Sequence, residues 1–212
     1  MKKRFLLGTL LAFTSYLHAE QASPVDSPSK MFIGAYGGYE VVSGTYNHDG
    51  RSVTGRLTLG VDAWNLDRWG FGFEGGFQSG NTMRLSTSDQ IILDSGGLPI
   101  QATLKPFVDF LASVKCRILS SHPLFVFVKG GFAFRQLQLE NRSSSSDHIN
   151  RINGEIQGGF SYQLTPHGRI SISYQGIISN SRSGIKLSEN NDILLRHIPT
   201  QQGALIGIEY SL

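Results

Sequence analysis

The strand-like segments of this chain carry their charged residues on one side of a two-residue alternation. In the segment 53–63, Leu57 and Leu59 share one phase with the other apolar residues, whereas Arg56 and Asp62 share the opposite phase. Successive residues of a β-strand point to opposite faces of its sheet. Each such segment therefore has one apolar face and one polar, charged face, and the chain is predicted to fold as β-sheet.

Eight segments show this pattern, and the connections between them alternate in length. The predicted strands are 32–42, 53–63, 69–79, 104–118, 124–137, 149–164, 169–179 and 199–212. The short connections are 64–68, 119–123 and 165–168, and the long ones are 43–52, 80–103, 138–148 and 180–198. Membrane-spanning β-barrels have short turns at one end and longer loops at the other. The sequence therefore predicts an all-β fold, a closed antiparallel eight-stranded up-and-down transmembrane β-barrel with both termini at the short-turn end.

A soluble barrel, which places its apolar face inside, is the alternative to a membrane barrel. The charge-bearing phase is also rich in Gly, Ser, Thr and Gln, which suits a narrow lumen filled by side chains. Closure satisfies every backbone polar group, as lipid requires. Aromatic residues cluster near strand ends, as in the girdles of membrane barrels. They are Trp64, Trp69, Phe71, Tyr162 and Tyr210 near the turns, and Tyr39, Phe77, Phe107, Phe134 and Tyr174 near the loops. Together these features favour the membrane barrel.

The beginning of the chain has the pattern of a secretory signal peptide. A basic start at residues 2–4 precedes an apolar stretch at 5–17, and Ala19 offers a small residue for cleavage. A retained anchor is the alternative, but the apolar stretch is too short to cross a bilayer as a helix. The expected division is a signal peptide at 1–19, a flexible leader at 20–30 and the barrel at 31–212.

Charge and composition exclude several classes of function. The chain has 19 lysines and arginines against 16 acidic residues, and removal of residues 2–4 leaves 16 against 16. We therefore expect no nucleic-acid partner. Cys116 is the only cysteine, so a disulfide framework is excluded. The histidines at 48, 122, 148 and 167 do not stand at metal-ligand spacing. We expect no metal and no cofactor.

The charges of the lumen face are the first candidate site. Isolated buried charges are costly, so these residues are expected to pair inside the barrel. An eight-stranded interior is just wide enough for its own side chains, which favours a structural ion-pair core over a selective pore. The predicted network is Arg56, Glu74, Asp109, Lys115, Lys129, Arg135, Arg151, Glu155 and Glu209.

The end of the seventh predicted strand is a second candidate. Residues 175–181 (QGIISNS) resemble the His-any-Ser-Asn segment of outer-membrane lipid A deacylases, in which a serine works with a histidine base. The expected histidine position holds Ile177, and a serine hydroxyl is a weak nucleophile without a base. His197 and Glu189 in the following loop are the remaining candidates to assist Ser179. An ordinary strand end is the favoured interpretation, so we expect no catalytic residue and no enzymatic activity.

The last strand carries a recognisable ending. The residues Ile206, Ile208, Tyr210 and Leu212 resemble the C-terminal signal through which the assembly machinery of Gram-negative bacteria recognises outer-membrane barrels, although the family usually ends in Phe. With its strand pattern, the chain resembles the small outer-membrane barrels of the outer-membrane protein A, X and W type. The resemblance implies a monomeric protein of the bacterial outer membrane that contacts its lipid and lipopolysaccharide and the barrel-assembly machinery.

Two functions are compatible with this resemblance. The first is a non-enzymatic envelope protein that supports membrane integrity or contacts a host or envelope surface ligand through the loops 80–103 and 180–198. The second is a small pore or conduit for small or apolar solutes. The loop 80–103 is rich in Ile and Leu. We expect it to extend the strands beyond the membrane as a hairpin, with folding over the barrel mouth or contact with a host surface as alternatives.

Overall fold

The computed structural model describes most of the chain from Lys30 onward, and there the fold is all β. The described residues are 30–46, 49–66, 68–86, 99, 101–119, 122–139, 148–179, 185–186, 193–195 and 198–212. No helix among them is long and apolar enough to cross a membrane. The predicted signal peptide at 1–19 and the leader up to residue 29 lie outside the described residues.

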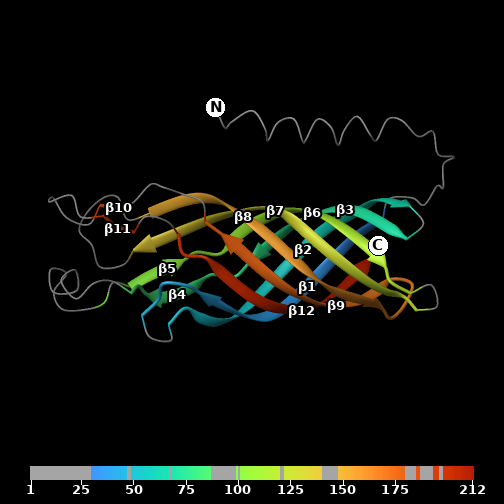
Figure 1. The fold of residues 1–212 in the computed structure, drawn as a ribbon, viewed down its shortest axis with the longest axis horizontal. Coiled ribbons are helices and arrows are strands. Elements are labelled where there is room, and N and C mark those ends of the chain that lie inside the picture. Colours follow the sequence, from blue (N-terminus) through green and yellow to red (C-terminus); the bar gives the residue numbers. More distant parts are fainter. Residues whose placement is uncertain are drawn as a thin grey trace, which may run out of the picture.

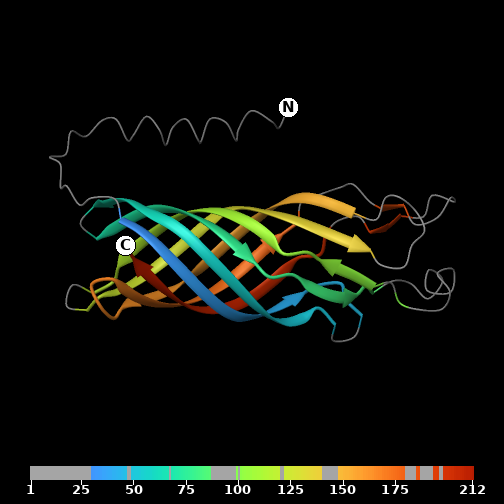
Figure 2. The ribbon, with the colours of Figure 1, turned by 180° about the vertical axis from the view of Figure 1, so that it is seen from behind.

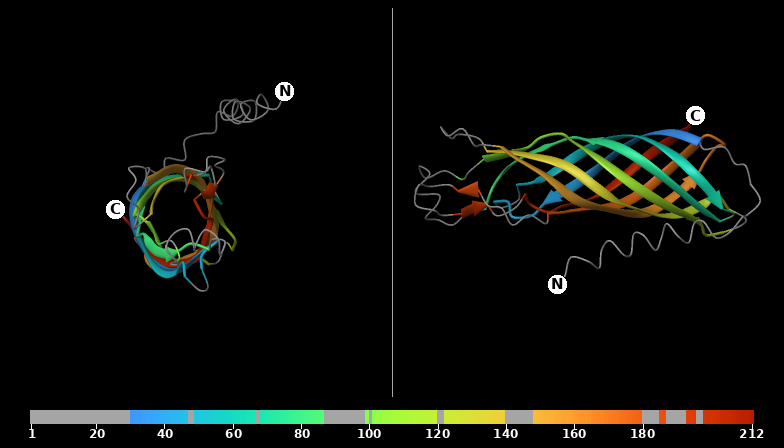
Figure 3. Two further views of the ribbon diagram at one scale, coloured as in Figure 1. Left: turned by 90° about the vertical axis from the view of Figure 1, so that its left-hand side faces the viewer. Right: turned by 90° about the horizontal axis from the view of Figure 1, so that it is seen from above.

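Eight long strands form the wall of a closed barrel (Figure 1). They are β1 (Lys30–Val42), β2 (Arg51–Leu66), β3 (Trp69–Gln78), β6 (Phe107–Arg117), β7 (Leu124–Leu139), β8 (His148–Gln163), β9 (Gly168–Ile178) and β12 (Gln201–Ser211). Each pairs antiparallel with the next along the chain, and β12 pairs with β1 to close the ring, which Figure 3 shows end-on. The predicted fold class is confirmed.

Four short strands lie at the loop end of the barrel (Figure 2). They are β4 (Asn81–Arg84), β5 (Gln101–Leu104), β10 (Ile185–Lys186) and β11 (Ile193–Leu195). β4 pairs with β5, β5 pairs with the end of β7, and β10 pairs with β11. The expected hairpin in the loop 80–103 is therefore present at its base, whereas residues 87–98 lie outside the described part.

One predicted strand is divided in two. The segment 104–118 was expected to be continuous, but Leu104 ends β5 and Phe107 begins β6. Pro106 lies in the gap, and proline has no N–H to give to a strand ladder. The Lys105 N–H still donates to the Gln136 carbonyl at 2.9 Å, so the break is local.

The barrel wall has the orientation that the alternation predicts. Large apolar side chains, including Leu57, Phe73 and Ile156, are exposed on the outer surface, whereas Arg56 and Lys129 are buried inside. A bulge in β2 between Asp62 and Trp64 shifts its register against β3. Because a bulge adds one residue to a strand, Trp64 faces outward although simple alternation from Asp62 would place it inside. It joins Trp69 on the outer surface of the turn end.

The predicted position of one girdle residue, Phe107, is wrong. Phe107 is only 3% exposed and lies in the lumen, whereas Tyr39, Phe77, Phe134 and Tyr174 are exposed as expected. Phe107 shares the inward phase of its neighbour Asp109, and the Arg135 guanidinium lies 5.9 Å from its ring centroid. A ring that covers a buried cation gains a cation–π interaction that the outer surface does not offer.

Phe32 and Tyr36 also point inward, and glycines on neighbouring strands make room for their rings. Phe32 faces Gly60 across the β1–β2 ladder, and Tyr36 faces Gly207 across the β1–β12 ladder. A side chain at either glycine would collide with the ring. Large and small residues therefore alternate around the lumen wall, as a narrow filled barrel requires.

Candidate functional site

The lumen has three layers, and the one nearest the turns is an ionic core. It alternates acids and bases in one chain, with each neighbouring pair within 4.0 Å. In order, the ionic core is Asp109, Arg56, Glu74, Lys129, Glu209, Arg169, Asp62 and Lys115. Four cations face four anions, so its formal charges cancel. Six different strands contribute, which ties opposite walls of the barrel together.

Arg56 makes three hydrogen bonds to carboxylates of the ionic core. Its Nε and Nη2 donate to the two carboxylate oxygens of Asp109 at 3.0 and 2.5 Å, and Nη2 also donates to Glu74 at 2.8 Å. A bidentate arginine–carboxylate pair fixes geometry as well as charge. Lys129 donates to the second oxygen of Glu74 at 2.7 Å. Glu74 is thus shared between two cations from opposite directions.

Aromatic rings and a tyrosine complete the ionic core. The Tyr36 hydroxyl donates to Glu209 at 2.6 Å, and Lys129 lies 5.5 Å from the centroid of the Tyr36 ring. Lys115 lies over Phe32 at 5.0 Å, so the inward rings cover the cations. Burial of charge is tolerated where partners and polarizable surfaces replace water.

The middle layer is built from glutamines and carboxylates rather than from ion pairs. Glu40 accepts from Gln78 at 3.0 Å and from Gln201 at 2.5 Å, while Gln175 bridges Gln78 and Glu155 at 2.9 and 2.7 Å. In this layer the neutral side-chain amides of glutamines donate hydrogen bonds to the carboxylates, whereas lysines and arginines do so in the ionic core. The layer therefore joins β1, β3, β8, β9 and β12 without direct salt bridges among the described residues.

Three residues of the predicted network lie at this middle level and contact no acid or base of opposite charge within 4.0 Å among the described residues. Arg135 donates to the Pro199 carbonyl and to Gln201, both at 3.0 Å. Arg151 is the cross-strand partner of Arg135 and donates to the Asn150 carbonyl at 3.3 Å. Glu155 accepts only from glutamines. The expectation that every lumen charge meets an opposite charge does not hold for these three.

The structure thus brings together six residues of the predicted network in the ionic core: Arg56, Glu74, Asp109, Lys115, Lys129 and Glu209. The prediction omitted Asp62 and Arg169, although both lie on the charged phase of their strands. It also omitted Glu40 and the glutamines. Their phase was readable from the sequence, but their partners come from distant strands.

The third layer is an apolar cap that fills the loop end. Its members are buried and lie toward the loop ends of the strands, except Leu85 and Ile198, which lie outside the strands. The apolar cap consists of Val42, Met83, Leu85, Ala102, Leu104, Phe107, Ala133, Leu137, Leu139, Ile149, Ile177 and Ile198. These contiguous side chains give the described part of this layer an apolar, packed interior in place of a polar lining.

The faces of the wall exchange character at the apolar cap. Along β7, Phe134 points outward and is 44% exposed, whereas Leu137 points inward and is fully buried. Thr82 and Arg84 of β4 face outward beside inward Met83. An apolar exterior suits lipid and a polar exterior suits water, so this exchange marks where the outer surface of β7 changes from one type to the other.

An exposed ion pair holds the first loop against β4. Arg84 donates to both carboxylate oxygens of Asp49 at 2.6 and 3.0 Å and lies 5.5 Å from the Tyr46 ring centroid. The hydrogen bonds from Arg84 lower the pKa of Asp49 below its ordinary value. This ion pair, the Asp49–Arg84 clamp, lies at the loop end of the barrel.

The serine candidate has no complete catalytic arrangement among the described residues. Ser179 follows β9, and its buried hydroxyl has no hydrogen-bond partner there. Ile177, at the expected histidine position, is part of the apolar cap. His197 and Glu189 lie outside the described residues. Within the described residues, no group of three potential ligands could hold a metal ion.

The residues of the predicted assembly signal all face outward. Ile206, Ile208, Tyr210 and Leu212 are exposed along one side of β12 and its end. β12 forms the seam with β1, and the Leu212 N–H donates to the Met31 carbonyl at 2.8 Å. The signal residues are therefore accessible on the outer wall next to the closing seam.

Comparison with known proteins gives matches in structure alone. No protein-family profile matches the chain. No curated protein matches it in sequence. Neisserial surface protein A is 10% identical, with a TM-score of 0.51 over 88% of this chain and 100% of the other. The chain has the fold of the small bacterial outer-membrane β-barrel proteins. The comparison also returns Ail, the attachment invasion locus protein of Yersinia pestis, at 15% identity and a TM-score of 0.49 over 87% of this chain and 97% of the other.

Proposed function

We propose that this chain is an integral, non-enzymatic protein of the bacterial outer membrane that supports envelope integrity or contacts surfaces through its loops. The observation that carries the proposal is an outward apolar belt around a lumen filled by its own side chains. Along β3 the belt runs from Trp69 to Phe77. Eight steps of about 3.4 Å, tilted by about 40°, give a height of roughly 21 Å, close to the band of membrane barrels.

The filled lumen supports a closed barrel over a pore. The ionic core satisfies its charges internally, and the apolar cap occupies the loop end above it. An open aqueous channel needs a wider barrel or a wall that leaves its centre free. We therefore propose a structural role for the predicted lumen network.

Two measurements test this part of the proposal. Expressed protein should appear in the outer-membrane fraction after separation on a density gradient. Purified protein in planar bilayers should give no steady unitary conductance, with a known porin in the same bilayer as the positive control. Steady unitary events at the protein's own insertion rate would instead establish the pore, the second function compatible with the sequence.

A loop deletion separates the two parts of the proposed role, support of envelope integrity and surface contact through the loops. A strain that lacks the gene should admit a bulky dye or detergent more readily than its parent. A variant that joins Ser86 to Gln101 through a short turn keeps β4, Leu85 of the apolar cap and β5 but removes the loop between them. If the barrel itself supports integrity, this variant restores the barrier. If only the full-length protein restores it, the loop carries the function.

The non-enzymatic part of the proposal rests on the surroundings of Ser179. Its neighbour Ile177 is apolar, and the hydroxyl is not hydrogen-bonded to any base among the described residues. Overexpression should release no fatty acid from lipid A, and the Ser179→Ala variant should give the same lipid profile. Serine-dependent release would contradict the proposal.

A further inference from the structure

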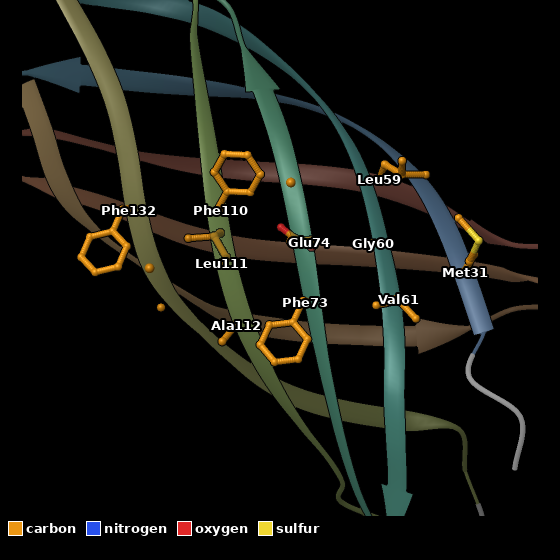
Figure 4. A pocket seen from close by; sticks show the side chains of 13 residues that line it. Met31, Leu59, Gly60, Val61, Phe73, Glu74, Phe110, Leu111, Ala112 and Phe132 are labelled. Carbon is orange, nitrogen blue, oxygen red and sulfur yellow. The ribbon is translucent and has the colours of Figure 1, made fainter. Parts of the chain in front are cut away.

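The outer wall and the lumen differ in what they offer to a polar ligand. A groove over Gly75 crosses the outer surface of β2, β3, β6 and β7, and Figure 4 shows phenylalanine rings standing around it. Glu74 also lines the groove, but its carboxylate accepts hydrogen bonds from Arg56 and Lys129 on the lumen side. The groove is therefore apolar, and buried polar groups without partners lie in the lumen instead.

Three side chains at the middle layer of the lumen carry buried polar atoms with no hydrogen-bond partner among the described residues. These atoms are Nε of Arg135, both amide atoms of Asn153 and Oε2 of Glu155. Arg135 and Asn153 are 1% exposed, and Glu155 is 4% exposed. Leaving a buried polar atom unbonded costs its full desolvation penalty, so native proteins usually satisfy such atoms with protein groups or ordered water.

The strand register brings Asn153 and Glu155 together beside small, apolar neighbours. The two residues stand two positions apart on β8, so both face the lumen side by side. Their cross-strand partners on β7 are Ala133 and Gly131. Neither partner has a polar side chain, and neither is large enough to fill the space in front of β8. The polar atoms of Asn153 and Glu155 Oε2 therefore cannot be satisfied by β7.

The side chain of Arg135 crosses this part of the lumen. It starts on β7, yet its Nη1 and Nη2 atoms donate to the Pro199 carbonyl and to Gln201 of β12, both at 3.0 Å. In the wall, β8 and β9 lie between β7 and β12. The side chain therefore passes over the inner face of β8, where Asn153 is a diagonal cross-strand neighbour of Arg135. Its Nε–H is the donor that has no partner along this path.

The unpartnered atoms combine donors with acceptors. The Nε–H group of Arg135 only donates, an ionised Glu155 only accepts, and the amide of Asn153 does both. An anion bound here would face the carboxylate of Glu155, and a cation would face the guanidinium of Arg135. A neutral molecule that both donates and accepts satisfies all three side chains. Buried water has this character and typically makes about three hydrogen bonds to such groups.

We propose that Arg135, Asn153 and Glu155 form a binding site for ordered water, which links the charges of Arg135 and Glu155. A water-mediated hydrogen bond can replace a direct contact at little enthalpic cost. Ala133 and Ile177, the cross-strand partners of Asn153 and Glu155, belong to the apolar cap. The site therefore lies against the underside of the cap, where the water is enclosed and does not make the lumen a channel.

The side-chain amide of Asn153 reports directly on this site. Deuterated, nitrogen-15-labelled protein is refolded in detergent micelles, and rotating-frame Overhauser spectra measure cross-peaks between side-chain amide protons and water. We expect a cross-peak at Asn153 with the sign of close contact, which is opposite to that of chemical exchange. The matched control is Gln175, whose Nε2 already donates to Gln78 and Glu155 at 2.9 and 2.7 Å, and it should show no such peak. No contact peak at Asn153, or equal peaks at both residues, would overturn the proposal.

The Asn153→Leu variant tests the same site through stability. If water is bound, leucine removes its partner and leaves Arg135 and Glu155 unlinked, so the urea midpoint of unfolding should fall. If the layer is dry, leucine removes two unsatisfied polar atoms and the midpoint should rise. Gln175→Leu breaks direct hydrogen bonds and should lower the midpoint in either case, which calibrates the measurement. An unchanged or higher midpoint for Asn153→Leu would count against bound water.

The wild-type spectrum decides the matter if Asn153→Leu does not fold, because it needs no variant. A dry layer overturns only the water site and leaves the closed barrel as proposed. The proposed function fails by different observations, namely steady unitary conductance in planar bilayers or absence of the protein from the outer-membrane fraction.

Discussion

At the scale of single residues, charge buried in the lumen is tolerated because each core ion has a partner of opposite sign. Arg56 compensates both Glu74 and Asp109, so two carboxylates depend on one guanidinium. Arg151 carries the same charge on the same inward phase, yet it contacts no acid within 4.0 Å among the described residues. The two arginines therefore form a matched pair for separating paired from unpaired charge.

Replacing Arg56 with Met should lower the free energy of unfolding by about 3–5 kcal/mol, because it leaves two buried carboxylates without a cation. Arg151→Met should cost about 1 kcal/mol or less. Urea unfolding in detergent or lipid, followed by tryptophan fluorescence, measures both. Addition of Glu74→Gln and Asp109→Asn should restore part of the loss in the Arg56 variant. Equal costs for the two arginines would contradict the compensation argument.

The clamp between Asp49 and Arg84 should show a small pH dependence. Because Arg84 lowers the pKa of Asp49 in the folded state, the pair stabilises the loop above the ordinary aspartate pKa of about 3.9. That contribution is lost as the pH falls through the lower, folded value. Nuclear magnetic resonance titration of the Asp49 carboxyl should give a higher pKa in Arg84→Gln than in wild type. An unchanged titration midpoint would show that the pair does not persist in solution.

At the scale of elements, β7 has a segment whose outer face is apolar and, at the loop end, a segment whose outer face is polar. On β7 the outward residues change from Phe132 and Phe134 to Gln136 and Gln138, while the inward residues change from Lys129 to Leu137. The two-residue alternation continues, but the inward side chains become apolar and the outward side chains become polar. The surrounding solvent, rather than the strand geometry, determines which content is stable on each face.

The same substitution on one face of β7 should therefore have different effects at two heights. Phe132→Arg should destabilise the barrel by about 2–4 kcal/mol in lipid, because it places a cation in hydrocarbon. Gln138→Arg should change stability by about 0.5 kcal/mol or less, because that side chain stands in water. Unfolding in vesicles compares the two. Similar costs at both positions would move the membrane boundary away from the exchange of faces.

At the scale of the whole molecule, closure is the property that makes the barrel resistant. The seam between β1 and β12 continues over eleven paired positions from Phe32 to Val42, so the wall leaves no free edge there. The ionic core links strands on opposite sides of the ring. Opening any part of the wall exposes backbone groups that lipid or detergent cannot satisfy.

An unheated sample in mild detergent should accordingly migrate on a gel at a different position from a boiled one. The folded barrel should persist until heating breaks the ring cooperatively. The boiled sample supplies the unfolded reference, and a soluble β-protein of similar size supplies the control. A single band position before and after heating would contradict a closed, detergent-resistant barrel.

Much of the fold was accessible from the sequence because β-alternation is a local property. The strand positions, the order of short and long connections, and the inward phase of Arg56 or Lys129 follow from neighbours along the chain. Phe107 was assigned wrongly because its aromatic character suggested a girdle, whereas its phase placed it beneath Arg135. Here phase was the better guide than residue type.

The sequence by itself determined which side chains enter the lumen, since a strand offers only two directions. Only the tertiary structure decided which of them meet. Arg56 and Asp109 stand far apart in the chain and touch because the tilt and register of β2, β3 and β6 bring them to one height. The bulge that turns Trp64 outward and the groove over Gly75 also arise from the pairing of several strands. Pairing register is a property of the closed ring, and no single segment contains it.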